Sequence, residues 1–107
     1  MPARIPIDRD RLAELCRRHR IRRLALFGSV LRDDFGPQSD VDVLIEFEPD
    51  ERVGMVRLHE IEQELPALLG HRRLDLINPK YLNRWLRDRV LAEAEVQYAA
   101  PADQEGR

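Results

Sequence analysis

Residues 24–47 read LALFGSVLRDDFGPQSDVDVLIEF, and this stretch decides the fold. The apolar run before Gly28 and the β-branched run from Val41 to Phe47 each predict a buried strand. Gly28-Ser29 directly follows the first run, and Asp40 and Asp42 stand at the start of the second. The sequence therefore predicts a glycine loop and a pair of carboxylates, each at the end of a strand.

The Gly28-Ser29 loop has the residue types that suit a phosphate group. Gly28 lets the backbone turn sharply and approach a ligand without a Cβ in the way, and Ser29 adds a hydroxyl. If residues 30–32 begin a short helix, the free N–H groups of its first turn point toward an anion in the loop. A triphosphate tail fits this arrangement.

Asp40 and Asp42 are two residues apart, so on a strand their side chains project from one face, about 7 Å apart. Two such carboxylates repel unless a cation lies between them, and Mg²⁺ binds carboxylate oxygens together with substrate phosphates. A pair of such ions roughly 3.5–4 Å apart can clamp the attacking and leaving oxygens of an in-line displacement. These aspartates are candidate ligands for a divalent metal.

Asp75 is the candidate third carboxylate. It lies in residues 74–77 (LDLI), the only other run that reads as a strand, on the face opposite Leu74 and Leu76. An aspartate between apolar strand residues is disfavoured by strand propensity and by burial, and a metal would compensate for both. The simpler alternatives are a turn at Gly28-Ser29, a solvated Asp-x-Asp, and an ion pair from Asp75 to an arginine at 72 or 73.

The combination of LFGS at 26–29, Arg32, SDVDVL at 39–44 and LDL at 74–76 resembles the minimal nucleotidyltransferases of the polymerase-β superfamily. The resemblance covers nearly the whole chain. It implies an α/β fold with a small mixed β-sheet and helices, of the polymerase-β-like nucleotidyltransferase type. Many small members of this group are antitoxins that transfer AMP from ATP to a tyrosine of a helical HEPN toxin, so the resemblance also implies a HEPN-family partner.

The same resemblance implies the roles of the site residues. Asp40 and Asp42 would bind metal, with two Mg²⁺ ions expected, and Asp75 would be the third acidic ligand, near the incoming hydroxyl. Gly28 and Ser29 would hold the β- and γ-phosphates of ATP. Arg32 would contact phosphate or, as we favour, pair with a nearby aspartate to hold the loop.

Composition is consistent with one small domain, predicted over residues 1–99, with residues 100–107 as a flexible tail. Larger relatives carry a further domain that helps grip nucleotide and acceptor, so a partner protein is also a physical expectation. The net charge of −2 makes no case for nucleic-acid binding. No signal peptide or membrane-spanning run is visible, which predicts a cytoplasmic protein.

Local signals predict the remaining elements. Asp8 is a plausible N-cap for a helix over about 9–19, where Cys16 should pack in the core. The arginines at 17–23 are expected at the end of that helix because the helix dipole favours cations there. The alternative is a basic patch that binds a phosphate or an acidic partner. Apolar residues at helical spacing over 55–68 predict a helix that covers the sheet, with Pro66 disturbing its last turn. Asn78-Pro79 should begin one or two helices reaching about residue 95, in which Tyr81 and Trp85 pack.

Three other functions stay open. The chain could neutralise a toxin by binding alone, it could modify a small molecule or an RNA end, or Ser29 could head a Ser-His-Asp arrangement. The identity of the acceptor, the transferred nucleotide and the stoichiometry are not determined by these residues.

Overall fold

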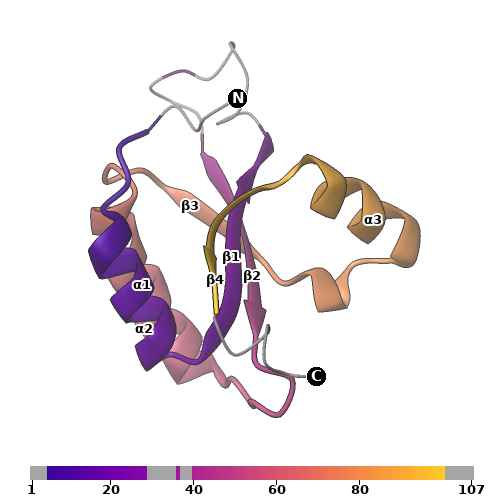
Figure 1. Ribbon diagram of the computed structural model, residues 1–107, viewed down its shortest axis with the longest axis horizontal. Helices are drawn as coiled ribbons and strands as arrows, with labels where there is room; N and C mark the ends of the chain where they lie inside the picture. The colour runs from indigo at the N-terminus through magenta and orange to yellow at the C-terminus, as the bar shows by residue number, and fades with distance from the viewer. Residues whose placement is uncertain (1–4, 29–35, 37–39, 101–107) are drawn as a thin grey trace.

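The computed structural model describes residues 5–28, 36 and 40–100. These residues form a four-stranded mixed sheet in the order β3-β2-β1-β4 (Figure 1). Strand β1 (Ile21–Phe27) pairs antiparallel with β2 (Val41–Phe47) and with β4 (Glu95–Ala99), while β3 (Leu74–Ile77) pairs parallel with β2. The predicted mixed-sheet α/β fold is confirmed.

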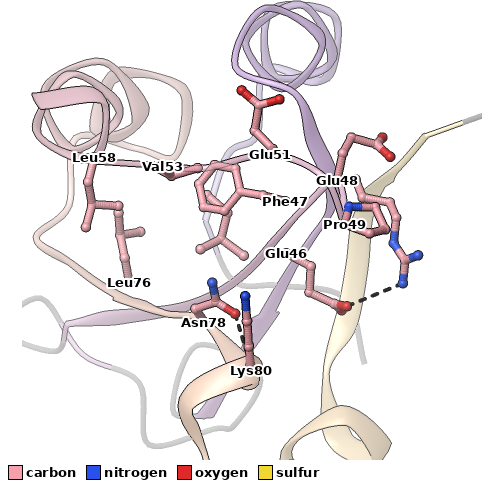
Figure 2. Close-up of a pocket in the computed structure, with 12 residues that line it drawn as sticks. Glu46, Phe47, Glu48, Pro49, Glu51, Val53, Leu58, Leu76, Asn78 and Lys80 are labelled. Carbon is pink, nitrogen blue, oxygen red and sulfur yellow. Dashed lines mark hydrogen bonds and ion pairs between the residues drawn. The ribbon is translucent and has the colours of Figure 1, made fainter. Parts of the chain in front are cut away.

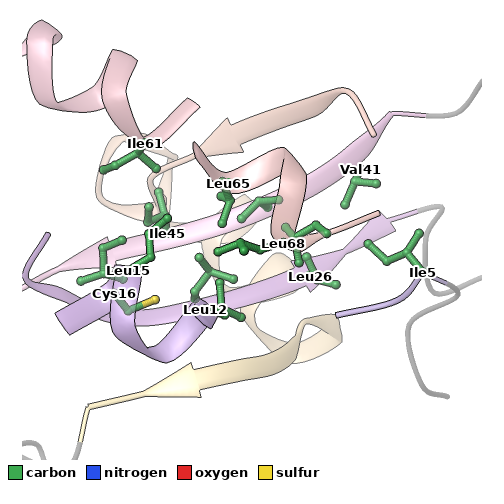
Figure 3. Close-up of a cluster of buried hydrophobic side chains, with 14 residues drawn as sticks. Ile5, Leu12, Leu15, Cys16, Leu26, Val41, Ile45, Ile61, Leu65 and Leu68 are labelled. Atoms are coloured by element: carbon green, nitrogen blue, oxygen red, sulfur yellow. The ribbon is translucent and has the colours of Figure 1, made fainter. Parts of the chain in front are cut away.

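Helices α1 (Arg9–Arg18) and α2 (Met55–Glu64) lie together on one side of the sheet, and α3 (Arg84–Glu93) lies on the other (Figure 1). The side chains at alternate positions of β2 point toward α1 and α2 and are buried. The resulting core combines both helices with the sheet (Figure 3) and includes Leu12, Leu15, Cys16, Leu24, Leu26, Val41, Val43, Ile45, Ile61 and Leu65.

Local chemistry explains where α1 begins and ends. The Asp8 side chain accepts a hydrogen bond from the backbone N–H of Arg11, as predicted for an N-cap. Arginines occupy the last turn, where the helix dipole favours cations, and Cys16 is fully buried beside its leucine neighbours. The predicted core role of Cys16 is confirmed.

The second helix is shorter than the apolar spacing predicts. It ends at Glu64 and continues as a 3-10 helix, η2 (Leu65–Leu68), because Pro66 cannot donate a hydrogen bond to the preceding turn. Ile61 and Leu65 are buried, but Met55 is 84% exposed. The expectation that the whole apolar stripe covers the sheet is therefore wrong at its first residue.

The C-terminal part differs most from expectation. After Asn78, whose side chain accepts from the Lys80 N–H, a 3-10 helix η3 (Pro79–Tyr81) precedes α3, so the segment is not one helix. Trp85 is 66% exposed, and the Arg89 guanidinium of its own helix lies over its ring, so its predicted packing role is wrong. Strand β4 was not predicted at all, although its alternating Val96 and Tyr98 were a signal for it.

The arginine-rich segment divides between two elements. Strand β1 begins at Ile21 rather than Leu24, so Arg22 and Arg23 lie on the strand, where both approach the carboxylate of Glu46. Arg18 instead binds Glu64 at the end of α2. Ion pairing across the fold, in addition to the helix dipole, therefore accommodates much of this positive charge.

The predicted domain boundary after residue 99 stays a prediction. Ala100 is buried, and its N–H donates to the Arg22 carbonyl at 2.8 Å, whereas residues 101–107 lie outside the described part of the chain. No helix within residues 5–28 and 40–100 has the length and apolar character needed to cross a membrane.

Candidate active site

The structure brings two of the three predicted aspartates together. Strands β2 and β3 run parallel with Asp42 paired in register with Asp75. In-register partners on adjacent strands project from the same face, with backbones about 4.8 Å apart. This face is opposite the one that carries Val41 and Val43 into the core, so both carboxylates lie on the α3 side of the sheet.

Gly28 lies directly against the Asp42 side chain. Because Phe27 pairs with Asp42 across β1 and β2, the next residue of β1 arrives beside that carboxylate. Gly28 has a φ of +80°, a conformation that L residues rarely adopt. A Cβ on Gly28 would lie 3.3 Å from Cγ of Asp42 and closer still to Oδ2. Only glycine leaves room for this carboxylate at the start of the loop.

Asp40 immediately precedes β2 and faces an arginine. Nε of Arg73 lies 3.8 Å from Oδ1 of Asp40, and the Arg73 carbonyl accepts the Val41 N–H at 2.9 Å. The neighbouring Arg72 donates a hydrogen bond to the Gly36 carbonyl. The sequence predicts these arginines only as possible partners for Asp75, because strand register cannot be inferred from local spacing.

Asp75 is exposed on the edge strand β3, and no hydrogen bond or ion pair reaches its carboxylate from the described residues. The argument that burial disfavours Asp75 is therefore wrong, since an edge strand leaves this face open to water. The predicted direction of the Asp75 side chain is confirmed, because Leu74 and Leu76 pack against the core on the opposite face of β3. Ser29 and Arg32, both predicted near phosphate, lie outside the described residues.

The donor set suits a hard cation, although the side chains are not gathered around one point. Within the described residues, no group of three or more His, Cys, Asp or Glu side chains is close enough to hold a metal ion. Asp40 faces Arg73 instead. The carboxylates of Asp42 and Asp75, on neighbouring strands beside Gly28, nevertheless offer the oxygen ligands that Mg²⁺ prefers. The residues present fit a magnesium site at Asp42 and Asp75, which are paired in register on neighbouring strands.

A cavity of about 410 Å³ lies elsewhere, near the far end of β2 (Figure 2). Its lining includes Phe47, Leu58, Leu76 and Lys80, and Glu46 at its rim is bound by Arg23 at 2.7 Å. Glu46 is four residues beyond Asp42, about 13 Å along the strand. The lining also contains Glu48 and Glu51, but Glu46 and Glu51 are paired with arginines and no glycine lines the cavity, so we place the chemistry at Asp42 and Asp75.

Three groups with perturbed pKa values, Cys16, Glu51 and Glu64, lie away from this site, and two of them are on α1 and α2. Burial raises the pKa of the Cys16 thiol to about 12, so the thiol is protonated and unreactive at neutral pH. A hydrogen bond from Arg18, aided by one from His19, lowers the pKa of Glu64. These shifts belong to the packing of α1 against α2, and neither group contributes to a second reactive centre.

Comparison with known proteins agrees with this geometry. The family described as nucleotidyltransferase domain matches residues 9–97. Protein adenylyltransferase MntA from Thermococcus cleftensis is 38% identical over 80 residues, which are 75% of this chain and 78% of that protein.

Solved structures confirm the fold. A candidate minimal nucleotidyltransferase matches with a TM-score of 0.67 and 33% identity, covering 81% of this chain and 86% of the other. A complex of tri-AMPylated Shewanella oneidensis HEPN toxin with MNT antitoxin matches with a TM-score of 0.58 and 20% identity, over 91% and 74% of the two chains. The predicted resemblance to minimal nucleotidyltransferases is thus confirmed, and the chain belongs to the nucleotidyltransferase domain family.

Proposed function

We propose that this protein is a cytoplasmic adenylyltransferase that transfers AMP from ATP to a tyrosine hydroxyl of a HEPN-family toxin, acting as its antitoxin. The observation that carries this proposal is the register of β2 and β3, which sets Asp42 opposite Asp75 beside the Gly28 turn. These are the parts that a metal-assisted transfer of a nucleotide needs at one point of a sheet.

Relatives support the same reaction and the same partner. MntA is described as a protein adenylyltransferase, and the Shewanella complex contains an AMPylated HEPN toxin with its MNT antitoxin. A related toxin–antitoxin structure contains the ATP analogue AMP-PNP. Another carries glutamates in place of two aspartates spaced two residues apart, the spacing of Asp40 and Asp42 in this chain.

In this proposal Gly28 and Ser29 hold the β- and γ-phosphates, and Asp40, Asp42 and Asp75 hold two Mg²⁺ ions. Bound Mg²⁺ would neutralise charge on the phosphates and lower the pKa of the incoming hydroxyl. Asp75, exposed on the edge strand, lies where an acceptor protein can approach from solvent. The tyrosine oxygen bonds to the α-phosphorus, the bond to pyrophosphate breaks, and the tyrosine proton passes to the Asp75 carboxylate or to adjacent water.

Most of the acceleration would then come from positioning and charge neutralisation, because the protein forms no covalent bond to the phosphoryl group. The strand pairing contributes the positioning. Asp42 is fixed by its neighbours on both sides, β1 through Phe27 and β3 through Asp75. Substitutions there should affect the reaction far more than they affect the fold.

The test is transfer of radiolabel from α-labelled ATP to a HEPN-family toxin, with the modified residue identified by mass spectrometry. We expect Mg²⁺-dependent labelling of a tyrosine, lost in Asp42→Asn and retained in the matched surface control Asp88→Asn on α3. Neutralisation of the toxin without ATP and without label would instead establish an antitoxin that acts by binding alone. Label on an RNA end or on a small molecule would move the acceptor to another class.

A further inference from the structure

Arg73 lies beside the candidate site and pairs with Asp40, a contact that local spacing did not predict. Its backbone is fixed, because its carbonyl accepts the Val41 N–H where β2 begins. Its side chain is 85% exposed, and its only partner among the described residues is Asp40, whose side chain is 49% exposed and lies 3.8 Å away. The side chain is thus anchored at its base and free to move at its tip.

The Asp40 contact is of a kind that exchanges easily. Ion pairs between exposed side chains add little to stability, since water screens the attraction and both side chains lose freedom. The Arg73 guanidinium is nevertheless a positive group within ion-pair distance of Asp40, one of the proposed metal ligands. In the metal-free chain it offsets the repulsion that Asp40 and Asp42 would otherwise exert on each other.

Binding of Mg²⁺ at Asp40 would make the contact between Arg73 and Asp40 unfavourable. A divalent cation and the guanidinium compete for the same carboxylate oxygens and repel each other once the cation is bound. The triphosphate that arrives with the metal is then the strongest anion near the guanidinium. Arginine binds phosphate oxygens through paired N–H groups, which makes it well suited to that second partner.

We infer that Arg73 is a positioning residue with an exchangeable partner: it neutralises Asp40 in the empty site and moves to the triphosphate when Mg-ATP binds. The inference rests on the proposed function for the identity of the nucleotide. It assigns a role to the residue two positions before Asp75, and it explains why Asp40 faces an arginine when Asp75 does not. The neighbouring Arg72, which donates to the Gly36 carbonyl, helps to hold this segment in place.

If Arg73 exchanges partners, its removal should strengthen Mg²⁺ binding and weaken Mg-ATP binding. A purely structural role would not give these opposite effects. Attraction between unit charges about 4 Å apart in water corresponds to about a fivefold change in a binding constant. In Arg73→Ala we expect the MgCl₂ concentration at half-maximal thermal shift, measured without nucleotide at constant ionic strength, to fall about fivefold. We expect KM for Mg-ATP to rise about fivefold, with kcat changed less than twofold.

Two further variants complete the design. Arg73→Lys keeps the charge and should give values between those of the wild type and Arg73→Ala. Arg89→Ala removes a comparable exposed pair on α3, where Arg89 lies 3.9 Å from Glu93, and should change neither quantity.

The inference is overturned if Arg73→Ala shifts both quantities in the same direction, or shifts neither, while the wild type transfers AMP. If the wild type transfers no AMP at all, the proposed function fails instead. The Mg²⁺ measurement needs no nucleotide and would still decide whether Arg73 competes for Asp40.

Discussion

Replacing Gly28 with alanine should inactivate the protein while leaving most molecules folded. The φ of +80° costs an L residue about 1–2 kcal/mol, and the new Cβ would overlap Oδ2 of Asp42. Relief requires the Asp42 side chain to leave its rotamer, at about 0.5–1.5 kcal/mol. We therefore expect the free energy of unfolding to fall by about 2–3 kcal/mol in urea denaturation, and Tm to fall by about 10 °C or more.

The effect on AMP transfer should be much larger. The Asp42 carboxylate must move by about 1 Å, and a displacement of that size at reacting groups can cost about a hundredfold in rate. Transfer measured at a temperature where both proteins are folded should fall by that factor or more. The loss should appear in kcat more than in KM for ATP, because Asp42 acts on the metal and the transferred phosphate.

Gly70→Ala is the matched control. Gly70 has a φ of +79°, and the nearest atoms to its added Cβ belong to Pro6 and Ile5, with Cδ of Pro6 at 3.3 Å, rather than to a candidate site residue. It should lose a similar amount of stability from the backbone and keep its kcat for AMP transfer. Full activity in Gly28→Ala, or equal loss of activity in both folded variants, would refute the reasoning about Asp42.

Four other outcomes are expected. Asp42→Asn should abolish labelling of the toxin yet melt no lower than the wild type without Mg²⁺, because it removes one of two repelling charges; a melt with and without Mg²⁺ checks this. Leu15→Ala should cost about 2–5 kcal/mol in urea denaturation, since Leu15 is fully buried. The pKa of Glu64 is lowered by Arg18, so its stabilising effect is present above the ordinary value of 4.5 and lost as pH falls below it; Glu64→Gln should reduce the acid-induced loss of unfolding free energy by less than about 1 kcal/mol, measured by urea denaturation at several pH values. The pKa of Cys16 rises to about 12, so a thiol reagent at pH 8 should react only after unfolding; rapid labelling of the native protein would contradict the packing of α1.

Local patterns in the sequence were sufficient for several elements. The β-branched run VDVLIEF predicted β2 with the bounds that the structure shows, and Asp8 predicted the start of α1. The apolar neighbours of Asp75 predicted which way it faces, and the helical spacing around Cys16 predicted its burial. In each case the signal lies within a few residues, where side-chain periodicity and capping chemistry act.

Other features depended on contacts between distant segments. Strand β4 is short and half exposed, so its pairing with β1, rather than its own propensity, makes it a strand. Exposure of Trp85 and Met55 likewise depends on what lies opposite them, which spacing along a helix does not specify.

The sequence by itself determined that a glycine turn and three aspartates occur at strand ends, and with them the family. Only the tertiary structure decided that Asp42 stands opposite Asp75, that Gly28 touches the Asp42 carboxylate, and that Arg73 faces Asp40. The physical reason is register: a shift of one residue between β2 and β3 would turn Asp75 to the other face, and nothing within either strand sets that alignment. It is set by the shared core beneath the sheet, where side chains from all of the elements must pack at once.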